Sequence, residues 1–367
     1  MLCLVLLVLC APALGQRQFM TNVRLELGSE NDRTASIRIG DLDGDGDLDL
    51  SVANGRHWPR QNVLYLNQGK ARFNLARPLG ADLSTSYATE IADLDGDGDL
   101  DIAVGNDLAP NVIFLNDGKG IFARHATFGV PSSIRSLTLA DLDGDGDVDI
   151  LATIRGARNQ IYWNDGAATF PASHAFGTAA DSTIDVAVTD LNKDGKPDLL
   201  LANRDAQPNA VILGGEEGKW GRAIPFGTGK DETRAVAVAD FDQDGNEDWA
   251  AGNIGGANAV FFGDGKGGVR ERVAFGRPDG ITYALAIGDL DQDGRPDLVV
   301  ANRGQSNAAF LNQGEADGFR EVRFGDAANA TYNVDVGDVN GDGFPDIAVA
   351  NSDAPNQIYL NLPLRKK

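Results

Sequence analysis

Short runs of alternating apolar and polar residues recur along the whole chain, and each run predicts a β-strand. In one set the apolar residues stand two positions apart, as in Ile37 and Ile39 or Leu137 and Leu139. A period of two with many β-branched residues is typical of strands. A second apolar run follows each of these after an acidic loop, a third begins after an asparagine, and a fourth opens with an aromatic or apolar residue. The fourth run closes on a glycine: Gly80, Gly129, Gly177, Gly227, Gly276 and Gly325.

The acidic loop between the first two runs shows that the pattern is a repeat. It has the form D-x-[DN]-x-D-G-x-x-D and recurs seven times, at spacings of 52, 48, 49, 50, 49 and 49 residues. Four short antiparallel strands repeated at this period predict an all-β fold, a seven-bladed β-propeller in which each blade covers its neighbour. An EF-hand is excluded because position 12 of the loop, such as Val52 or Val104, is apolar and lies in a predicted strand.

The two ends of the repeat array predict how the ring closes. The last unit stops after its third strand, at residues 358–361, and so lacks a fourth. The first unit is preceded by residues 19–28, which have the Phe-to-Gly layout of a fourth strand. We therefore expect residues of about 18–27 to complete the seventh blade, and residues 16–367 to form a single propeller domain.

Each loop offers side-chain oxygens at positions 1, 3, 5 and 9, with glycine at position 6 for a tight turn. Carboxylate and amide oxygens gathered in this way are typical of calcium sites. A single copy is equally typical of a solvated acidic turn, but seven copies in register favour metal. Asparagine at position 3 removes one charge in the fourth and seventh loops, so we expect weaker binding there. The predicted ligands are Asp41, Asp43, Asp45 and Asp49; Asp93, Asp95, Asp97 and Asp101; Asp141, Asp143, Asp145 and Asp149; Asp190, Asn192, Asp194 and Asp198; Asp240, Asp242, Asp244 and Asp248; Asp289, Asp291, Asp293 and Asp297; Asp338, Asn340, Asp342 and Asp346.

The loops, together with F-G pairs at Phe128, Phe176, Phe226, Phe275 and Phe324, resemble FG-GAP or VCBS-type repeats, the units of the integrin α-subunit propeller. The resemblance covers nearly the whole chain after residue 15. It implies up to seven Ca²⁺ ions between the first two strands of the blades, and a binding or adhesion function. It does not exclude an enzyme, because similar repeats occur within some polysaccharide lyases and phospholipases. It also implies a backbone carbonyl ligand at position 7: Asp47, Asp99, Asp147, Lys196, Asn246, Arg295 and Phe344.

Composition favours an exported protein. Residues 1–15 are apolar and uncharged, too short to span a membrane, and resemble a signal peptide without the usual basic start. Both cysteines, Cys3 and Cys10, lie in this segment, and lipidation at Cys10 is an open alternative. We expect a secreted, periplasmic or cell-surface location and no membrane span.

The formal charge is −22, and seven divalent ions would offset more than half of it. No Lys/Arg stripe is present and the one basic cluster is the tail 365–367, so nucleic acid is not expected as a partner.

No nucleophile elbow, phosphate loop or His/Cys cluster indicates catalysis. We therefore expect a monomeric binding or adhesion module for a protein or a glycan, with a calcium-dependent lectin and, more remotely, a polysaccharide-active enzyme as alternatives. Ligand identity stays open.

Topology places the loops between the second and third strands on the face opposite the calcium loops. There the first unit has a longer loop, 55–61, with Trp58 between Arg56 and Arg60, which suits a sugar ring or an acidic peptide unless Trp58 covers a blade junction.

One position on the innermost strands carries charge in three consecutive blades. Three residues before the loop, most units have a small residue, but blades seven, one and two have Asp335, Arg38 and Glu90. We expect the cation to pair with the two carboxylates, the alternative being weak contacts in a wet central channel.

Overall fold

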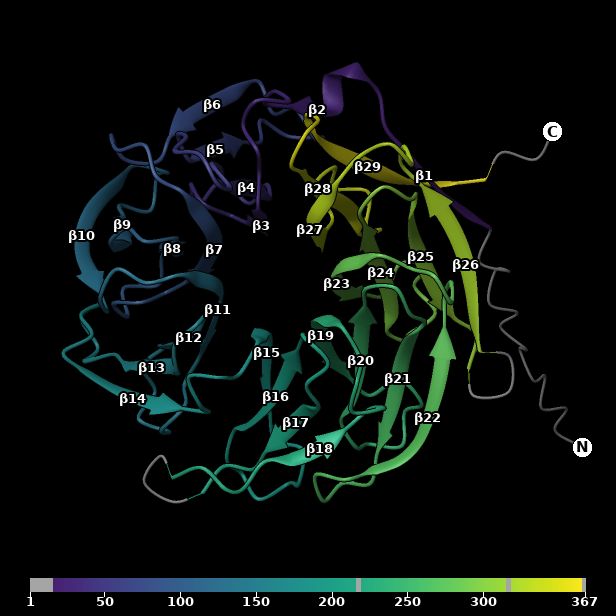
Figure 1. The fold of residues 1–367 in the computed structure, drawn as a ribbon. Coiled ribbons are helices and arrows are strands. Elements are labelled where there is room, and N and C mark those ends of the chain that lie inside the picture. The colour runs from purple at the N-terminus through teal and green to yellow at the C-terminus, as the bar shows by residue number, and fades with distance from the viewer. Residues whose placement is uncertain (1–15, 216–218, 315–317, 365–367) are drawn as a thin grey trace, which may run out of the picture.

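The computed structural model describes residues 16–215, 219–314 and 318–364. The expected signal peptide at 1–15, with Cys3 and Cys10, and the tail 365–367 lie outside these residues. Seven antiparallel sheets stand around a central axis as the blades of a propeller (Figure 1). Among the described residues the only helix is a short 3-10 turn, η1 (Val23–Leu25). The all-β, seven-bladed architecture expected from the repeat is confirmed.

Each blade uses consecutive strands, with the first strand innermost. Blade 1 is β3 (Ser36–Gly40), β4 (Asp49–Ala53), β5 (Val63–Leu66) and β6 (Leu75–Pro78); blade 2 is β7 (Ser86–Ala92), β8 (Asp101–Asn106), β9 (Asn111–Asn116) and β10 (Phe122–Phe128); blade 3 is β11 (Ile134–Ala140), β12 (Asp149–Ile154), β13 (Asn159–Trp163) and β14 (Ala172–Phe176). Blade 4 is β15 (Thr183–Thr189), β16 (Asp198–Asn203), β17 (Asn209–Ile212) and β18 (Ile224–Phe226); blade 5 is β19 (Thr233–Ala239), β20 (Asp248–Asn253), β21 (Asn258–Gly263) and β22 (Val269–Phe275); blade 6 is β23 (Thr282–Gly288), β24 (Asp297–Asn302), β25 (Asn307–Asn312) and β26 (Phe319–Phe324).

Blade 7 joins the two ends of the described chain. Its strands β27 (Thr331–Gly337), β28 (Asp346–Asn351) and β29 (Asn356–Pro363) are followed outward by β1 (Arg17–Met20), and β2 (Glu26–Leu27) also pairs with β29. Arg17 donates from Nε to the side-chain oxygen of Asn361 at 2.8 Å, and its guanidinium lies 3.6 Å from the ring centre of Phe344. The predicted closing strand is therefore confirmed, although η1 divides it into two short pieces.

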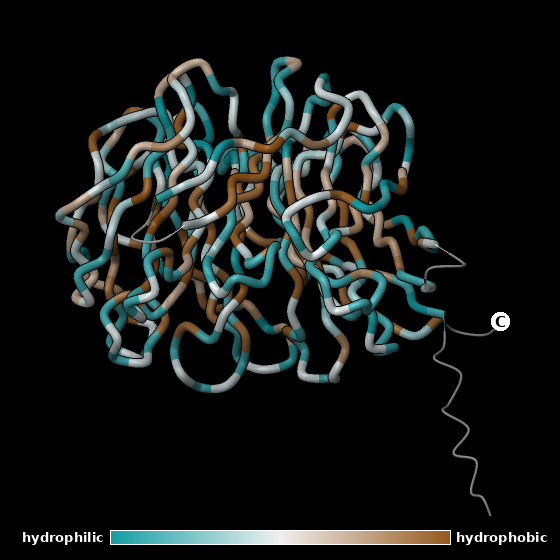
Figure 2. The backbone as a smooth tube through the Cα atoms, turned by 90° about the horizontal axis from the view of Figure 1, so that it is seen from below, coloured by the Kyte–Doolittle hydropathy of each residue, from teal (hydrophilic) through white to brown (hydrophobic). Residues whose placement is uncertain are grey.

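Apolar side chains pack between the blades in seven clusters, one at each junction. Figure 2 shows the ring edge-on, with these apolar strand segments between two rims of loops. The F-G pairs lie at the junctions: Phe275 of blade 5 packs against Phe310 of blade 6 with ring centres 5.0 Å apart. The glycine that follows has a positive φ and leaves room for the next blade. At Gly129 (φ 61°) a Cβ atom would lie 2.3 Å from the hydroxyl oxygen of Tyr162, so only glycine fits.

Candidate metal centres

The acidic loops all connect the first strand of a blade to the second, so they share one face of the ring. Within each loop the aspartate at position 1 orders the turn. Asp41 accepts hydrogen bonds from the backbone N–H groups of Gly44 at 2.8 Å and Gly46 at 3.0 Å, and the bond from position 6 recurs in all seven loops. Position 5 caps the end of the turn, since Asp45 accepts from the N–H of Asp47 at 2.9 Å.

The aspartate at position 9 is buried and holds the loop to the third strand. Asp49 accepts from the N–H of Leu42 in the loop at 3.0 Å and from the N–H of Asn67 after β5 at 2.6 Å. Burial raises the pKa of Asp49 to about 7, and the same cause raises the pKa of Asp297 and Asp346 to about 7. This carboxylate is therefore a structural link as well as a candidate ligand, a second role that the loop pattern alone did not reveal.

Position 3 provides the test of whether these loops suit a cation. One carboxylate oxygen, Oδ1, of both Asp43 and Asp291 is buried without a hydrogen-bond partner among the described residues. Burial raises the pKa of Asp43, and the charges of Asp45 and Asp41 raise it further. An unpartnered buried carboxylate oxygen facing other carboxylates costs free energy that a bound cation would remove. The donor set is entirely oxygen, as Ca²⁺ prefers. The residues present therefore fit calcium.

Carboxylate oxygens within 4.8 Å of one another gather in five of the loops, as expected from their spacing. The groups are Asp41, Asp43 and Asp45; Asp93, Asp95 and Asp101; Asp141, Asp143 and Asp149; Asp240, Asp242 and Asp248; Asp289, Asp291 and Asp297. In the seventh loop Asn340 instead donates its amide to Asp346, at 3.0 Å to Oδ2, so its side chain already serves the buried carboxylate. This contact gives a physical reason for the weaker binding expected there.

Arginines form ion pairs with carboxylates of two of the loops, which the repeat pattern did not indicate. Arg270, on β22, forms ion pairs with Asp242 and with Asp244 at 3.1 Å. Arg295, at position 7 of the sixth loop, pairs with Asp293. A guanidinium at these carboxylates competes with a metal ion for the same oxygens.

Asparagines at the end of the third strand tie five of the seven loops to the loop of the preceding blade. Asn116 donates from Nδ2 to the carbonyl oxygen of Leu42 in the preceding blade, at 2.9 Å, and Asn67, Asn164, Asn312 and Asn361 make the equivalent bond. Blades 4 and 5 have Gly214 and Gly263 at this position and cannot make it. The seven loops are thus linked in a chain that is interrupted at two successive junctions.

On the opposite face the repeated asparagines hold the turn between the second and third strands and reach the next blade. Asn54 donates to the carbonyl oxygen of Gln61 at 2.9 Å and closes the turn between β4 and β5. Asn62 donates to the hydroxyl of Ser86 in the next blade at 2.9 Å. At the junction of blades 3 and 4 the corresponding atoms, Asn159 Nδ2 and Thr183 Oγ1, have no partner among the described residues.

The predicted ligand-face residues do not form one patch. Trp58 is 59 % exposed, so it does not cover a junction. Arg60 donates outward to the carbonyl oxygen of Asn31 at 2.9 Å. Arg56 instead lies over the ring of Tyr332, 3.9 Å from its centre, and lines a cavity at the mouth of the central channel.

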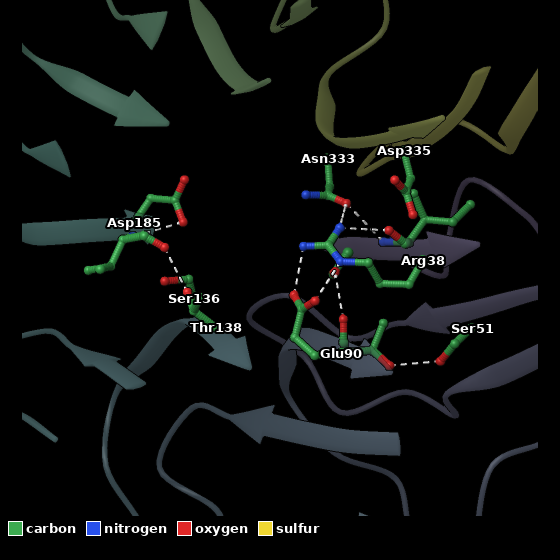
Figure 3. Close-up of polar contacts among 12 residues, drawn as sticks. Arg38, Ser51, Glu90, Ser136, Thr138, Asp185, Asn333 and Asp335 are labelled. Atoms are coloured by element: carbon green, nitrogen blue, oxygen red, sulfur yellow. Dashed lines mark hydrogen bonds and ion pairs between the residues drawn. The ribbon is translucent and has the colours of Figure 1, made fainter. Parts of the chain in front are cut away.

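The charges expected to pair on the innermost strands do so in part (Figure 3). Arg38 donates from Nε and Nη2 to the two carboxylate oxygens of Glu90, at 2.7 and 2.6 Å, and from Nη1 to the side-chain oxygen of Asn333 at 2.7 Å. Asp335 makes no direct contact with Arg38. Its oxygens accept the backbone N–H groups of Ile39 and Val336 at 2.8 and 2.9 Å. The expected cluster of three charges is therefore an ion pair of Arg38 with Glu90. The remaining side-chain partner of the Arg38 guanidinium is the amide oxygen of Asn333, and not Asp335.

Comparison with known proteins agrees with the repeat analysis. A sequence model described as FG-GAP-like repeat matches residues 41–104, 93–152, 141–201, 190–251, 240–300 and 289–349. No curated protein matches this chain. Two crystal structures of BBS1N in complex with ARL6DN, soaked with mercury and with lead, are similar in fold, each at 13% sequence identity. They have TM-scores of 0.65 and 0.64, cover 95% of this chain, and are themselves covered over 98% and 99% of their length.

Proposed function

Because the chain belongs to the FG-GAP-like repeat family, we propose that it is a secreted, calcium-loaded propeller that acts as a binding or adhesion module rather than as an enzyme. The fold itself is typical of a binding scaffold. The observation that carries the calcium proposal is the unpartnered buried oxygen of Asp43 and Asp291, in loops whose other carboxylates lie within reach of the same point. In the proposal, aspartate or asparagine at positions 1, 3, 5 and 9 holds the ion in each loop. Bound Ca²⁺ supplies positive charge that cross-links the two ends of the turn.

The proposed ligand is a protein, held on the face opposite the acidic loops. Support comes from the position of Trp58, an exposed aromatic side chain on the longest loop of that face, and from the fold neighbour BBS1N, whose structure was solved in complex with ARL6DN. Among the described residues no helix is long and apolar enough to cross a membrane. We propose that the module works as a monomer outside the cytoplasm.

Metal analysis and thermal unfolding of the purified chain test the calcium proposal. We expect several bound Ca²⁺ ions, and we expect chelation to lower the melting temperature by more than about ten degrees, because it leaves three or four carboxylates crowded in each loop. An empty protein with an unchanged melting curve would contradict the proposal. A secreted-protein pull-down beside a glycan array, with and without calcium, tests the ligand class. One protein partner supports the proposal, whereas multivalent glycan binding would replace it with a lectin.

A further inference from the structure

Five arginines from four blades meet at the mouth of the central channel, on the face opposite the acidic loops. They line one cavity of about 320 Å³, which lies at the start of the innermost strands. We call this group the arginine mouth: Arg56 of blade 1, Arg135 and Arg155 of blade 3, Arg204 of blade 4 and Arg234 of blade 5. The expectation that the tail held the one basic cluster is thereby corrected, since residues far apart in sequence assemble a second one in space.

Three of the five guanidinium groups, those of Arg56, Arg135 and Arg234, lie over aromatic rings. Arg135 lies 4.5 Å from the ring centre of Tyr87, and Arg234 lies 4.7 Å from that of Tyr283. A guanidinium over a ring is oriented before any ligand arrives. That of Arg135 is fixed further by donating from Nη1 to the carbonyl oxygen of Ile134 at 3.1 Å and from Nη2 to the hydroxyl of Ser133 at 2.8 Å. The cavity therefore presents ordered donors.

The positive charge of the mouth is incompletely neutralised. Two carboxylates, Asp181 and Asp205, line the same cavity as the five arginines. Asp181 already accepts from the N–H and the hydroxyl of Thr178, at 2.6 and 2.5 Å, and Asp205 accepts from the hydroxyl of Ser182 at 2.6 Å. Arg135 has a carboxylate of Asp107 at 3.6 Å, and Arg204 has one of Glu232 at 3.8 Å. These contacts leave an excess of cations in a protein of formal charge −22.

Two arginines of the mouth have donors without a hydrogen bond. The Nε atom of Arg234 is buried without a hydrogen-bond partner among the described residues, and that of Arg204 is also buried without a hydrogen bond and has only the ion-pair contact with Glu232 at 3.8 Å. Within the same residues the Arg155 side chain makes no hydrogen bond, ion pair or ring contact, and it is exposed at the rim. A buried charged donor that lacks an acceptor costs free energy, and an incoming anion would recover it.

The surrounding groups also reflect a positive potential. Burial lowers the pKa of Arg234, and the charge of Arg204 lowers it further. Burial by itself would raise the pKa of Tyr283, but the hydrogen bond from Arg303 and the charges of Arg234 and Arg303 outweigh burial and lower it. The lowered pKa of Tyr283 is the shift expected where cations gather.

Below the arginine mouth the charged residues of the channel wall are mainly negative. Glu90, Asp185 and Asp335 line the channel there, with Arg38 between two of them (Figure 3). Asp185 accepts backbone N–H groups from Val186 and Val236, both at 3.1 Å. An anion drawn to the arginines is repelled by this layer, so it would stop at the mouth instead of entering the channel.

We propose that the arginine mouth binds a compact group with two or more negative charges, formed by neighbouring carboxylates or by a phosphate, on an acidic segment of a partner protein. The inference deepens the proposed function and rests on it in placing the ligand on this face. A cavity of this size accommodates one or two acidic side chains, and the forked donors of arginine match the oxygens of carboxylate and phosphate.

The test measures binding by calorimetry at low and physiological salt, with the full chain in calcium. The probes are a peptide of six glutamates, a phosphoserine peptide, citrate, inorganic phosphate and a peptide of six lysines. The variants are Arg155→Gln and Arg56→Gln, with Arg222→Gln as the matched control because Arg222 is exposed on the outside of blade 4. We expect an acidic peptide to bind, each mouth variant to weaken it about tenfold or more, and the control to leave it unchanged.

The outcomes separate the sources of the anion. Tighter binding of an acidic peptide than of citrate or phosphate supports a protein segment, whereas equal binding of the free anions keeps the site but assigns it to a small molecule. No binding of any anion at low salt overturns the inference, as does equal weakening by Arg222→Gln or equal binding of the lysine peptide. Calcium content is measured on the same samples. Anion binding by a protein that contains no calcium refutes the calcium proposal and supports the arginine mouth. Bound calcium without any anion binding supports the calcium proposal and refutes the arginine mouth.

Discussion

The ion pair between Arg38 and Glu90 offers a sharp test of how the channel wall is held together. Both side chains are mostly covered, with exposed fractions of 26% and 15%, and the contact is bidentate. Replacing Arg38 by alanine leaves Glu90 without a cation and near two further carboxylates, Asp335 and Asp185. Breaking a fully buried pair costs about 3–5 kcal/mol. Since water in the channel reaches this pair, we expect Arg38→Ala to lower the free energy of unfolding by roughly 2–3 kcal/mol.

An exposed pair elsewhere in the chain serves as the control. Arg323 and Glu321, on the outer strand β26, are 2.7 Å apart, but their exposed fractions are 56% and 34%. Arg323→Ala should therefore cost less than about 0.5 kcal/mol. Urea unfolding monitored by tryptophan fluorescence compares the two variants. We expect the double variant Arg38→Ala with Glu90→Ala to be less destabilised than Arg38→Ala alone, because it removes the stranded charge. Equal costs for Arg38→Ala and Arg323→Ala, or additive effects in the double variant, would show that the pair contributes nothing beyond a surface contact.

Three further outcomes follow from contacts described above. Deleting residues 16–27 removes β1 and β2 and should expose the edge of β29, giving a less stable protein that self-associates in light scattering; a stable monomer would refute the closing role of these strands. Gly129→Ala should destabilise by several kcal/mol, because a positive φ adds to a clash with Tyr162. The control Gly304→Ala, at a φ of 65° with open space around it, should cost only about 1 kcal/mol, and equal melting temperatures for the two would contradict the packing argument. Arg270→Ala should raise calcium affinity at the fifth loop in isothermal titration, since it removes a competing cation, whereas unchanged affinity would mean that Arg270 yields freely to the ion.

The repeat made most of the fold predictable, because spacing and strand periodicity are local properties of the sequence. The seven loops, the four strands of each blade and the closing strand all follow from positions counted along one unit. The predicted start of the fourth strand was wrong in three blades. Phe73, Phe170 and Trp220 precede β6, β14 and β18 instead of opening them, so an apolar residue at this position does not by itself mark where strand pairing begins.

Contacts between blades were harder to predict, because they join residues of neighbouring units through geometry that only the folded ring provides, and across the closure the two residues stand 295 positions apart. Asn333 replaced Asp335 as the partner of Arg38 for this reason. The arginine mouth did leave a trace in the sequence. Six residues before each loop, the units carry Tyr87, Arg135, Arg234, Tyr283 and Tyr332 in five of seven positions, a mixture of tyrosine and arginine that alignment of the repeats reveals once this column is inspected.

The asparagine bonds between loops bear on which junction between blades would open first when the protein unfolds. At the junction of blades 3 and 4 Gly214 replaces the linking asparagine on one face, and Asn159 and Thr183 stay unlinked on the other. The hydrogen bonds that remain between the two blades run from Thr138 Oγ1 to the carbonyl oxygen of Val186 at 2.7 Å and from Thr153 Oγ1 to that of Ile184 at 3.2 Å, beside the apolar packing. This junction lies across the ring from the strands that join the two ends. A heating experiment that reports only on the distance between the termini would miss an opening that starts at this junction, because the strands that join the two ends lie on the other side of the ring. Such an opening would turn the closed disc into an open crescent whose ends are blades 3 and 4.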